Sequence, residues 1–180
     1  KETNATVESI RELASQIVSL RKKFTSYKSF AGKSIDEIFE KSVLKKARIL
    51  EVHTLASGYL KNENNTFTFI PFKNELQVSP ISAFLEYDFN ADGDNEVLVA
   101  GNYFGVSPYQ GRFDSFPGAL IFNEDKVVLG NKIGLDFNQK AVKKLNIIKV
   151  QNKSYVLATI NNDHAQVYEL THLKDDYKKL

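Results

Sequence analysis

The chain has 180 residues, of which 42% are hydrophobic and 26% are charged, and its formal net charge is +2. This composition is typical of one or two globular domains and excludes an intrinsically disordered chain. The absence of cysteine excludes disulfides, thiolate catalysis and cysteine-based zinc sites. No apolar run approaches the roughly 20 residues that span a bilayer, so we expect no transmembrane segment. The sequence opens with neither Met nor a signal peptide, so we expect a mature or excised segment.

Charge and hydrophobic periodicity change at the same place in the chain. Residues 1–48 contain 11 Lys or Arg and 6 Asp or Glu, a net charge of +5, whereas residues 49–180 contain 13 and 16, a net charge of −3. We therefore predict a helical segment over 1–48 that packs on a β part over 49–180. The predicted fold class is mainly β with an N-terminal helical segment (α+β).

Residues 1–48 show two helical patterns. One amphipathic helix is predicted to begin at Thr6, because apolar residues recur at three- and four-residue steps. These residues are Val7, Ile10, Leu13, Ile17, Leu20 and Phe24. The stretch 34–37 matches a capping box and predicts a second helix to about Ala47. We interpret the basic run 21–23 as a solvated face and predict no binding of nucleic acid, with phosphate or an anionic surface as the alternative partner.

After Arg48 the sequence consists of short strand patterns separated by turns. The stretch 57–71 predicts a hairpin around a polar turn at 62–65. Seven apolar runs follow, namely ISAFLEYDF, EVLVAGNYF, GALIFN, KVVLG, VKKLNIIKV, SYVLATI and AQVYEL. Because no helical period intervenes, we predict consecutive antiparallel sheets rather than a parallel βαβ fold.

Two segments of the β part form a weak internal repeat. LEYDFNADGDNEVLVAGN, from Leu85, aligns with LNIIKVQNKSYVLATINN, from Leu145, as strand, polar turn, strand and Asn. The spacing suits one four-stranded propeller blade enlarged by the long loop 101–118, which predicts about two blades of a β-propeller. The second copy lacks acidic turn residues, so only the first is expected to hold a metal.

The first copy contains a candidate metal loop, DFNADGDNE. Oxygen-bearing side chains stand at alternate positions, Gly93 then permits a sharp turn, and a glutamate closes the loop. This pattern suits a hard cation with many oxygen ligands, and Ca²⁺ suits it better than Mg²⁺. The predicted ligands are Asp88, Asn90, Asp92, Asp94 through its backbone oxygen, and Glu96.

Two other interpretations of this loop were considered. An EF-hand does not fit, because Val99 stands where a bidentate Glu is required and a strand pattern follows. The alternative to a metal site is an Asn-rich turn held by the hydrogen bonds of its own Asp and Asn side chains. We favour the metal site, because carboxylates packed this closely repel one another unless they are neutralised.

The loop resembles the calcium loop of FG-GAP/VCBS repeats, the blades of integrin-α-like β-propellers, with Glu96 where that family more often has Asp. Nearly the whole chain resembles the C-terminal region of large secreted VCBS-repeat proteins of Bacteroidetes type, which carry the ASPIC/UnbV label. The similar stretches are KKFTSYKSFAGKSIDEIF, GYLKNENNTFTFIPF, GNYFGVSPYQGRFDSFPGALIF and TINNDHAQVYEL.

This resemblance implies a secreted, periplasmic or cell-surface protein with a helical insertion before its last blades. It implies no defined activity. Propellers close with about four to eight blades, whereas this chain offers about two. Either the helical segment caps the open sheet edges or the chain associates with another copy through them.

Catalytic motifs are absent from the sequence. It contains no G-x-S-x-G, H-E-x-x-H or P-loop pattern, and His53, His164 and His172 are scattered. Arg112 and Asp114 lie two residues apart in the long loop, and their role has several interpretations. They are an ion pair, a ligand-contacting pair, part of a carboxylate site, or residues that hold the loop by hydrogen bonds, and we favour the last. Pairs such as Asp114 with Asp163 are the candidates for glycosidase chemistry.

The same loop is rich in aromatic residues: Tyr103, Phe104, Tyr109, Phe113 and Phe116. We expect Phe104 and Phe113 to pack, and we leave Tyr103 and Tyr109 open as contacts for sugars or a partner's side chains. Two functions follow. The first is a non-catalytic, calcium-binding propeller segment that binds protein or glycan, and the second is a polysaccharide hydrolase or lyase that uses carboxylates of the long loop.

Overall fold

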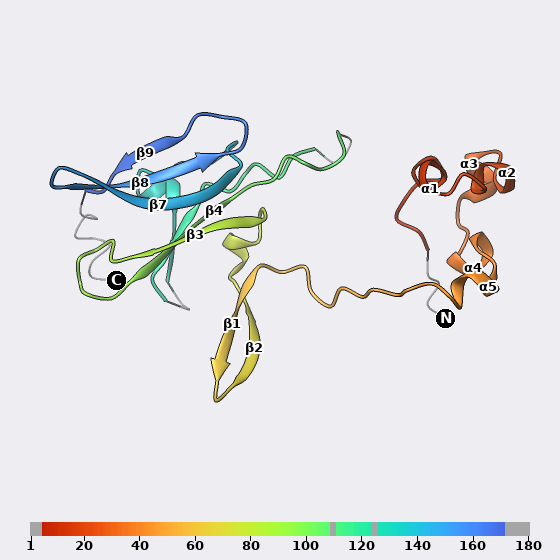
Figure 1. Ribbon diagram of the computed structural model, residues 1–180, viewed down its shortest axis with the longest axis horizontal. Coiled ribbons are helices and arrows are strands. Elements are labelled where there is room, and N and C mark those ends of the chain that lie inside the picture. Colours follow the sequence, from red (N-terminus) through yellow and green to blue (C-terminus); the bar gives the residue numbers. More distant parts are fainter. Residues whose placement is uncertain (1–4, 109–110, 124–125, 172–180) are drawn as a thin grey trace. The chain divides into compact units, whose positions relative to one another are not determined.

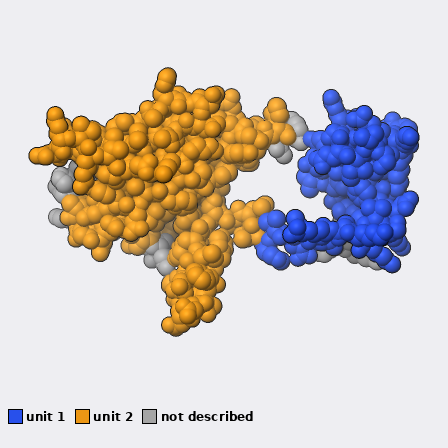
Figure 2. Space-filling view, viewed as in Figure 1, with its two compact units in different colours: residues 1–53 blue, residues 54–180 orange. Residues whose placement is uncertain are grey.

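The computed structural model describes residues 5–108, 111–123 and 126–171 (Figure 1). The chain divides into two compact units, 1–53 and 54–180, which Figure 2 shows in different colours. Among the described residues, the α-helices lie in unit 1 and the strands in unit 2, and every pairing between named strands is antiparallel. The predicted fold class, mainly β with an N-terminal helical segment, is therefore confirmed. The division falls after His53, and the preceding residues 46–53 contain no helix or strand.

Unit 1 consists of five short helices: α1 Ile10–Gln16, α2 Leu20–Lys23, α3 Tyr27–Phe30, α4 Ile35–Ile38 and α5 Lys41–Leu44. Their buried side chains form one apolar cluster of Ile10, Ala14, Leu20, Phe24, Phe30 and Ile38. None of the helices in the described part of the chain is long and apolar enough to cross a bilayer.

The single helix predicted from Thr6 is wrong, because the chain forms α1 and α2 instead. Ser9 starts α1 through a capping box, in which the Glu12 carboxylate accepts a hydrogen bond from the Ser9 backbone N–H at 2.9 Å. Val7 lies before this start and is fully exposed. The helix ends at Gln16, where the β-branched pair Ile17 and Val18 follows, and β-branched side chains are poor helix formers.

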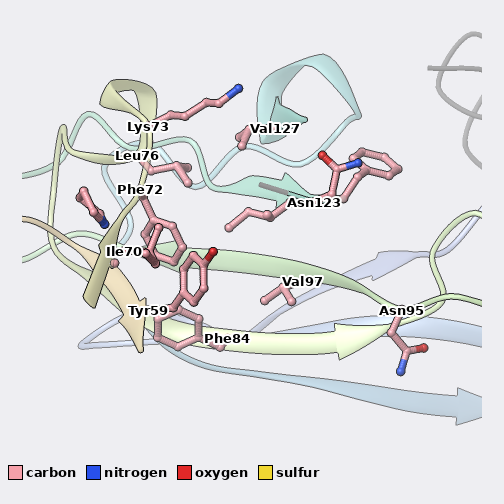
Figure 3. A pocket seen from close by; sticks show the side chains of 14 residues that line it. Tyr59, Ile70, Phe72, Lys73, Leu76, Phe84, Asn95, Val97, Asn123 and Val127 are labelled. Carbon is pink, nitrogen blue, oxygen red and sulfur yellow. The ribbon is translucent and has the colours of Figure 1, made fainter. Parts of the chain in front are cut away.

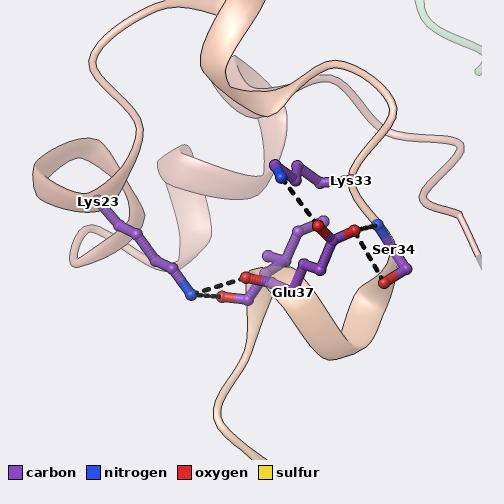
Figure 4. Close-up of polar contacts among 5 residues, drawn as sticks. Lys23, Lys33, Ser34 and Glu37 are labelled. Atoms are coloured by element: carbon purple, nitrogen blue, oxygen red, sulfur yellow. Dashed lines mark hydrogen bonds and ion pairs between the residues drawn. The ribbon is translucent and has the colours of Figure 1, made fainter.

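The second predicted helix starts where expected but is interrupted. The Glu37 carboxylate accepts hydrogen bonds from the backbone N–H and the hydroxyl of Ser34, at 2.9 and 3.1 Å, and forms an ion pair with Lys33 at 2.8 Å (Figure 4). Phe39 then adopts an extended backbone, so the segment splits into α4 and α5 and ends at Leu44 rather than Ala47.

Unit 2 begins with the hairpin of β1 (Gly58–Glu63) and β2 (Thr66–Pro71), which confirms the predicted hairpin. Its turn is tighter than the predicted 62–65, because Asn64 and Asn65 alone connect the strands, both with positive φ. The 3₁₀ turn η1 (Asn74–Leu76) leads to the larger sheets.

Two meandering sheets form the rest of unit 2. The first contains β3 (Ile81–Tyr87), β4 (Glu96–Gly101), β5 (Ala119–Ile121) and β6 (Val127–Leu129) in that order. After η3 (Gly130–Lys132), the second contains β7 (Val142–Val150), β8 (Lys153–Ile160) and β9 (Gln166–Glu169). All seven predicted runs thus form strands, in the predicted chain order.

The main core of unit 2 lies between these two sheets. It contains Ala83, Leu98, Ala100 and Leu120 from the first sheet, Val142, Leu145, Val156, Ala158 and Ile160 from the second, and Leu135 and Phe137 from the connection. The opposite face of the first sheet is covered in part by a second cluster, in which Leu76 of η1 and Phe116 bury Val99 and Ala119.

The two sheets begin with the same irregularity. Ser82 is an extra residue in the β3–β4 pairing, and Lys143 is an extra residue in the β7–β8 pairing. The Ser82 hydroxyl donates a hydrogen bond to the carbonyl of Val142, the residue before Lys143, at 2.6 Å, so a side chain at one irregular position joins the two sheets. The aligned segments from Leu85 and Leu145 each lie in the first hairpin of their sheet.

Candidate functional site

The acidic loop 88–95 connects β3 to β4 and is held by hydrogen bonds of its own side chains. Asp88 accepts from the backbone N–H groups of Asp92 at 3.2 Å and Gly93 at 3.1 Å. Asn90 accepts from the Asp92 N–H at 2.9 Å, and Asp92 accepts from the Asp94 N–H at 2.9 Å. This is the bonding pattern of consecutive Asx turns.

Three of the predicted ligands converge. The Asn90 side-chain Nδ2 lies 2.7 Å from Asp92 Oδ2 and 2.9 Å from Glu96 Oε1, so it donates to both carboxylates. Asn90 and Glu96 are buried, with exposed fractions of 6% and 3%. The partly positive N–H groups of a neutral amide therefore stand between these carboxylates, at the place where a cation would stand.

The other two predicted ligands lie differently. Both oxygens of Asp88 face backbone donors of the turn, and the Asp94 residue is exposed, with its N–H bonded to Asp92. Among the described residues, no group of three or more His, Asp or Glu side chains is arranged to hold a metal ion. The Asn90 amide oxygen accepts from the Asp92 N–H and its Nδ2 faces the two carboxylates, so Asn90 would have to turn its amide to join Asp92 and Glu96 as a metal ligand.

The buried Glu96 and the exposed Asp92 have pKa values shifted in opposite directions. Burial raises the pKa of Glu96, the hydrogen bond from the Phe89 N–H at 2.9 Å opposes that rise, and the charges of Asp92 and Asp88 add to it. The exposed Asp92 shows the opposite effect, because hydrogen bonds from the Asp94 N–H and the Asn90 amide lower its pKa. A buried carboxylate beside an ionised neighbour is a group that a cation stabilises.

The long loop after β4 forms a narrow ribbon. Tyr103 and Phe113 exchange two backbone hydrogen bonds, of 2.8 and 3.1 Å. Both side chains are exposed, at 43% and 44%. The expectation that Phe113 packs is therefore wrong, because its pairing with Tyr103 leaves its ring at the surface. Tyr109 lies outside the described residues.

Cationic side chains cover two of the aromatic rings in this loop. The Arg112 guanidinium lies 5.1 Å from the centroid of Phe104, and the Lys143 ammonium lies 5.8 Å from that of Tyr103. Asp114 accepts from the Ser115 hydroxyl at 3.4 Å, and its backbone carbonyl accepts from the Gln139 N–H at 2.8 Å. Arg112 and Asp114 form no ion pair in the described structure, so they do not form a joint site with each other.

A pocket of about 500 Å³ is the site that the sequence did not predict (Figure 3). Its floor is one row of side chains across the outward face of the first sheet, Val97, Ile121 and Val127, which are opposite one another in the strand register. Leu76 and Phe116 cover the next row, so the pocket occupies the uncovered half of the face. No sequence pattern distinguishes the covered row from the open one.

Aromatic and polar residues form the walls of this pocket. Tyr59, at the base of β1, and Phe72 lie with their ring centroids 6.0 Å apart, and Phe84 of β3 is 55% exposed at the same side (Figure 3). Lys73, Asn95 and Asn123 supply polar groups at the margin. A mainly apolar pocket of this size with a few polar groups is typical of ligand sites.

The two histidines in the described residues, His53 and His164, belong to no metal-binding group. The exposed His53 lies 4.0 Å from Glu51, and His164 donates its backbone N–H to the Asp163 carboxylate at 2.7 Å. His172 lies outside the described residues. Comparison of the chain with protein-family models, with curated proteins and with solved structures found no match.

Proposed function

We propose that residues 54–180 form a non-catalytic binding segment of FG-GAP/VCBS type, similar to two blades of a β-propeller and stabilised by Ca²⁺. In this proposal the parent protein is secreted, periplasmic or at the cell surface, and the segment binds a protein or glycan ligand. The observation that carries the binding function is the pocket over the open half of the first sheet. Its aromatic walls and its few amide groups suit a ligand with an apolar face and hydroxyl or amide groups.

The propeller assignment is supported by the two sheets themselves. Each is a meander that starts with the same hairpin, each has one extra residue at the same place, and the two pack face to face around one core. Repetition of one sheet unit along the chain, with packing between neighbours, is the construction of a propeller.

The metal is supported by the donors present in the loop. Asp92 and Glu96 would hold the ion with carboxylate oxygens, and Asn90 would add its amide oxygen by turning the amide whose Nδ2 faces them here. Asp88 would keep the turn in place through its bonds from the Asp92 and Gly93 N–H groups. Bound Ca²⁺ would supply positive charge that neutralises these carboxylates and stabilises the β3–β4 connection. The proposed role is structural.

A panel of soluble glycans and surface proteins tests the function with two measurements for each ligand, binding and turnover. We expect saturable binding without product, and we expect Phe84→Ala to weaken it because Phe84 lines the pocket and is half exposed. Release of product from a glycan would instead favour the hydrolase or lyase alternative and its loop carboxylates. Binding that Phe84→Ala leaves unchanged would place the ligand elsewhere and contradict the pocket assignment.

A further inference from the structure

Unit 1 has a pocket of its own whose walls carry unpaired positive charge. The pocket measures about 430 Å³ and lies between α1, α2 and the start of α3. Buried side chains form its floor, namely Ile10, Ala14 and Phe24. Arg11 and Arg21 stand at its walls, and none of the residues that line it is acidic.

Neither arginine is used by the fold. In the described part of the chain, the side chains of Arg11 and Arg21 have no ion pair, hydrogen bond or ring contact. The nearby carboxylates are engaged elsewhere: Glu12 accepts from the Ser9 N–H, and a hydrogen bond with Glu12 raises the pKa of Glu8. Two arginines thus line one pocket, and no acidic residue lines it with them.

Lys23, which follows Arg21 in the same basic run, differs from Arg21 because its charged group is used in contacts within unit 1. Its ammonium group donates to the backbone carbonyls of Glu37 at 2.9 Å and Ile38 at 2.7 Å, at the end of α4 (Figure 4). It also lies 5.5 Å from the centroid of the Phe24 ring. Arg21 makes no such contact, so its charge remains available to a ligand.

We propose that this pocket binds a sulfate or phosphate ester carried on a ring. The planar guanidinium groups of Arg11 and Arg21 match the oxygens of a tetrahedral anion and donate two hydrogen bonds each. The ring packs on the apolar floor and against Tyr27, whose side chain is 64% exposed at the pocket wall. A double-stranded nucleic acid does not suit this site. Two arginines in one pocket bind a single anionic group, whereas a duplex presents a row of phosphates that requires a row of cations.

This inference goes beyond the function proposed for unit 2 and depends on neither its metal nor its ligand. The test is an NMR titration of the whole chain with N-acetylglucosamine 6-sulfate and with phenyl phosphate. The uncharged parents, N-acetylglucosamine and phenol, are titrated in parallel. We expect at least one ester to bind saturably and to shift the signals of Ala14 and Phe24, which lie in the floor. We also expect neither parent to bind measurably.

Matched variants separate the pocket from general positive charge. Arg11→Gln and Arg21→Gln are each expected to weaken ester binding about tenfold or more, since a charged hydrogen-bond pair contributes that much. Lys22→Gln removes the same charge from an exposed neighbour outside the pocket and is expected to change affinity less than about twofold. Arg21→Lys keeps the charge but loses the planar guanidinium with its paired N–H donors. The affinity of this variant for the ester should therefore lie between those of Arg21→Gln and Lys22→Gln.

The outcomes discriminate clearly. A preference for the sulfated sugar or for the aryl phosphate identifies the source of the ester, and either supports the pocket. Equal weakening by Lys22→Gln, binding of the uncharged parents as tight as that of the esters, or binding of duplex DNA or RNA in place of both esters would each overturn the proposal. Because the three altered side chains, Arg11, Arg21 and Lys22, are exposed, far-ultraviolet circular dichroism should show unchanged folding in all four variants.

Discussion

The side chain of Asn102 holds the backbone of Phe116 by two hydrogen bonds. Its Oδ1 accepts from the Phe116 N–H at 3.1 Å, and its Nδ2 donates to the Phe116 carbonyl at 3.0 Å. The same Nδ2 donates to the carbonyls of Phe137 at 2.8 Å and Lys140 at 3.1 Å. One buried amide thus joins the end of β4 to the segment that precedes β5 and to the segment that leads into β7.

Asn102→Ala is expected to destabilise the chain by about 3 kcal/mol or more. The substitution removes the hydrogen-bond partner of both the N–H and the carbonyl of the buried Phe116, and each unsatisfied buried group costs about 1–3 kcal/mol. It also places Ala at φ 76°, a conformation that Asn tolerates better. Urea unfolding measures the change. Asn152→Ala, in the exposed β7–β8 turn, is the control and should change stability by less than about 0.5 kcal/mol.

Calcium is expected to stabilise the wild-type chain by about 2.7 kcal/mol at a hundredfold excess over its dissociation constant, because the ion binds only the folded loop. Asp92→Ala should abolish this gain, since Asp92 is one of the converging ligands. Asp94→Ala should weaken it only slightly, because the predicted contribution of Asp94 is its backbone oxygen. Thermal melts in EGTA and in millimolar calcium measure both effects. A wild-type midpoint that ignores calcium, together with no heat of binding, would mean that the loop is only a turn.

The Glu37 carboxylate should make unit 1 sensitive to acid. The hydrogen bond from Lys33, aided by those from Ser34, lowers the pKa of Glu37 to about 2 from its usual 4.5. Because the folded-state value is depressed, the stabilisation is fully present above about pH 5 and is lost as the pH falls toward 2. The carboxyl carbon shift in an NMR titration reports this pKa directly. Glu37→Gln should remove the acid sensitivity, whereas Glu40→Gln, one turn away on the surface, should retain it.

The effect of Glu96 on the pH dependence of stability should be opposite to that of Glu37. The folded-state pKa of Glu96 is raised, so its contribution to stability is present at acid pH below its usual value and is lost as the pH rises through the raised pKa. Calcium should lower this pKa, because a bound cation favours the ionised carboxylate, and binding should therefore release protons. Calorimetry in two buffers of different ionisation enthalpy measures that release. Identical apparent heats in both buffers near the raised pKa would contradict a metal on Glu96.

Two phenylalanines of similar exposure distinguish binding in the pocket of unit 2 from nonspecific binding to exposed apolar surface. Phe84 lines the pocket and is 55% exposed, whereas Phe67 of β2 is 64% exposed and does not line it. Phe84→Ala should therefore abolish the binding of an environment-sensitive apolar dye, and Phe67→Ala should leave it unchanged. Each substitution should cost less than about 1 kcal/mol in urea unfolding, since both rings are already largely in water. Equal loss of dye binding in both variants would point to a diffuse apolar surface.

Local signals in the sequence predicted the strands of unit 2 well. Runs such as VKKLNIIKV are apolar, rich in β-branched residues and bounded by turn residues, so strand propensity and burial favour the same structure. The helices were predicted less well, because an apolar period persists through Ile17 and Val18 although the capping box at Ser9 and the β-branched pair confine the helix to one short piece. Periodicity gives the side that is buried, and the caps decide where a helix begins.

The site whose residues are close in the sequence was predicted, and the site whose residues come from distant segments was not. The spacing of Asp88, Asn90, Asp92 and Glu96 lies within nine residues, so the sequence predicted the loop. The pocket of unit 2 is built from β1, β2, η1 and all four strands of the first sheet, and it exists because Leu76 and Phe116 cover one row and not the next. Such coverage depends on tertiary packing, which no local pattern encodes.

The bond from the Ser82 hydroxyl to the Val142 carbonyl has a consequence for how such a chain can lengthen during evolution. The acceptor is a main-chain oxygen, so the second sheet can change its side chains at this junction without losing the link. The donor is a side chain, and the equivalent position in the second sheet is Lys143, which lacks a hydroxyl. A duplicated copy of the first sheet, inserted before the second sheet, would bring its own serine as the hydrogen-bond donor to the sheet that follows. For a copy added after the second sheet, Lys143 would first have to be replaced by a residue with a hydroxyl group. Growth by duplication is therefore favoured toward the N-terminal side of this pair of sheets.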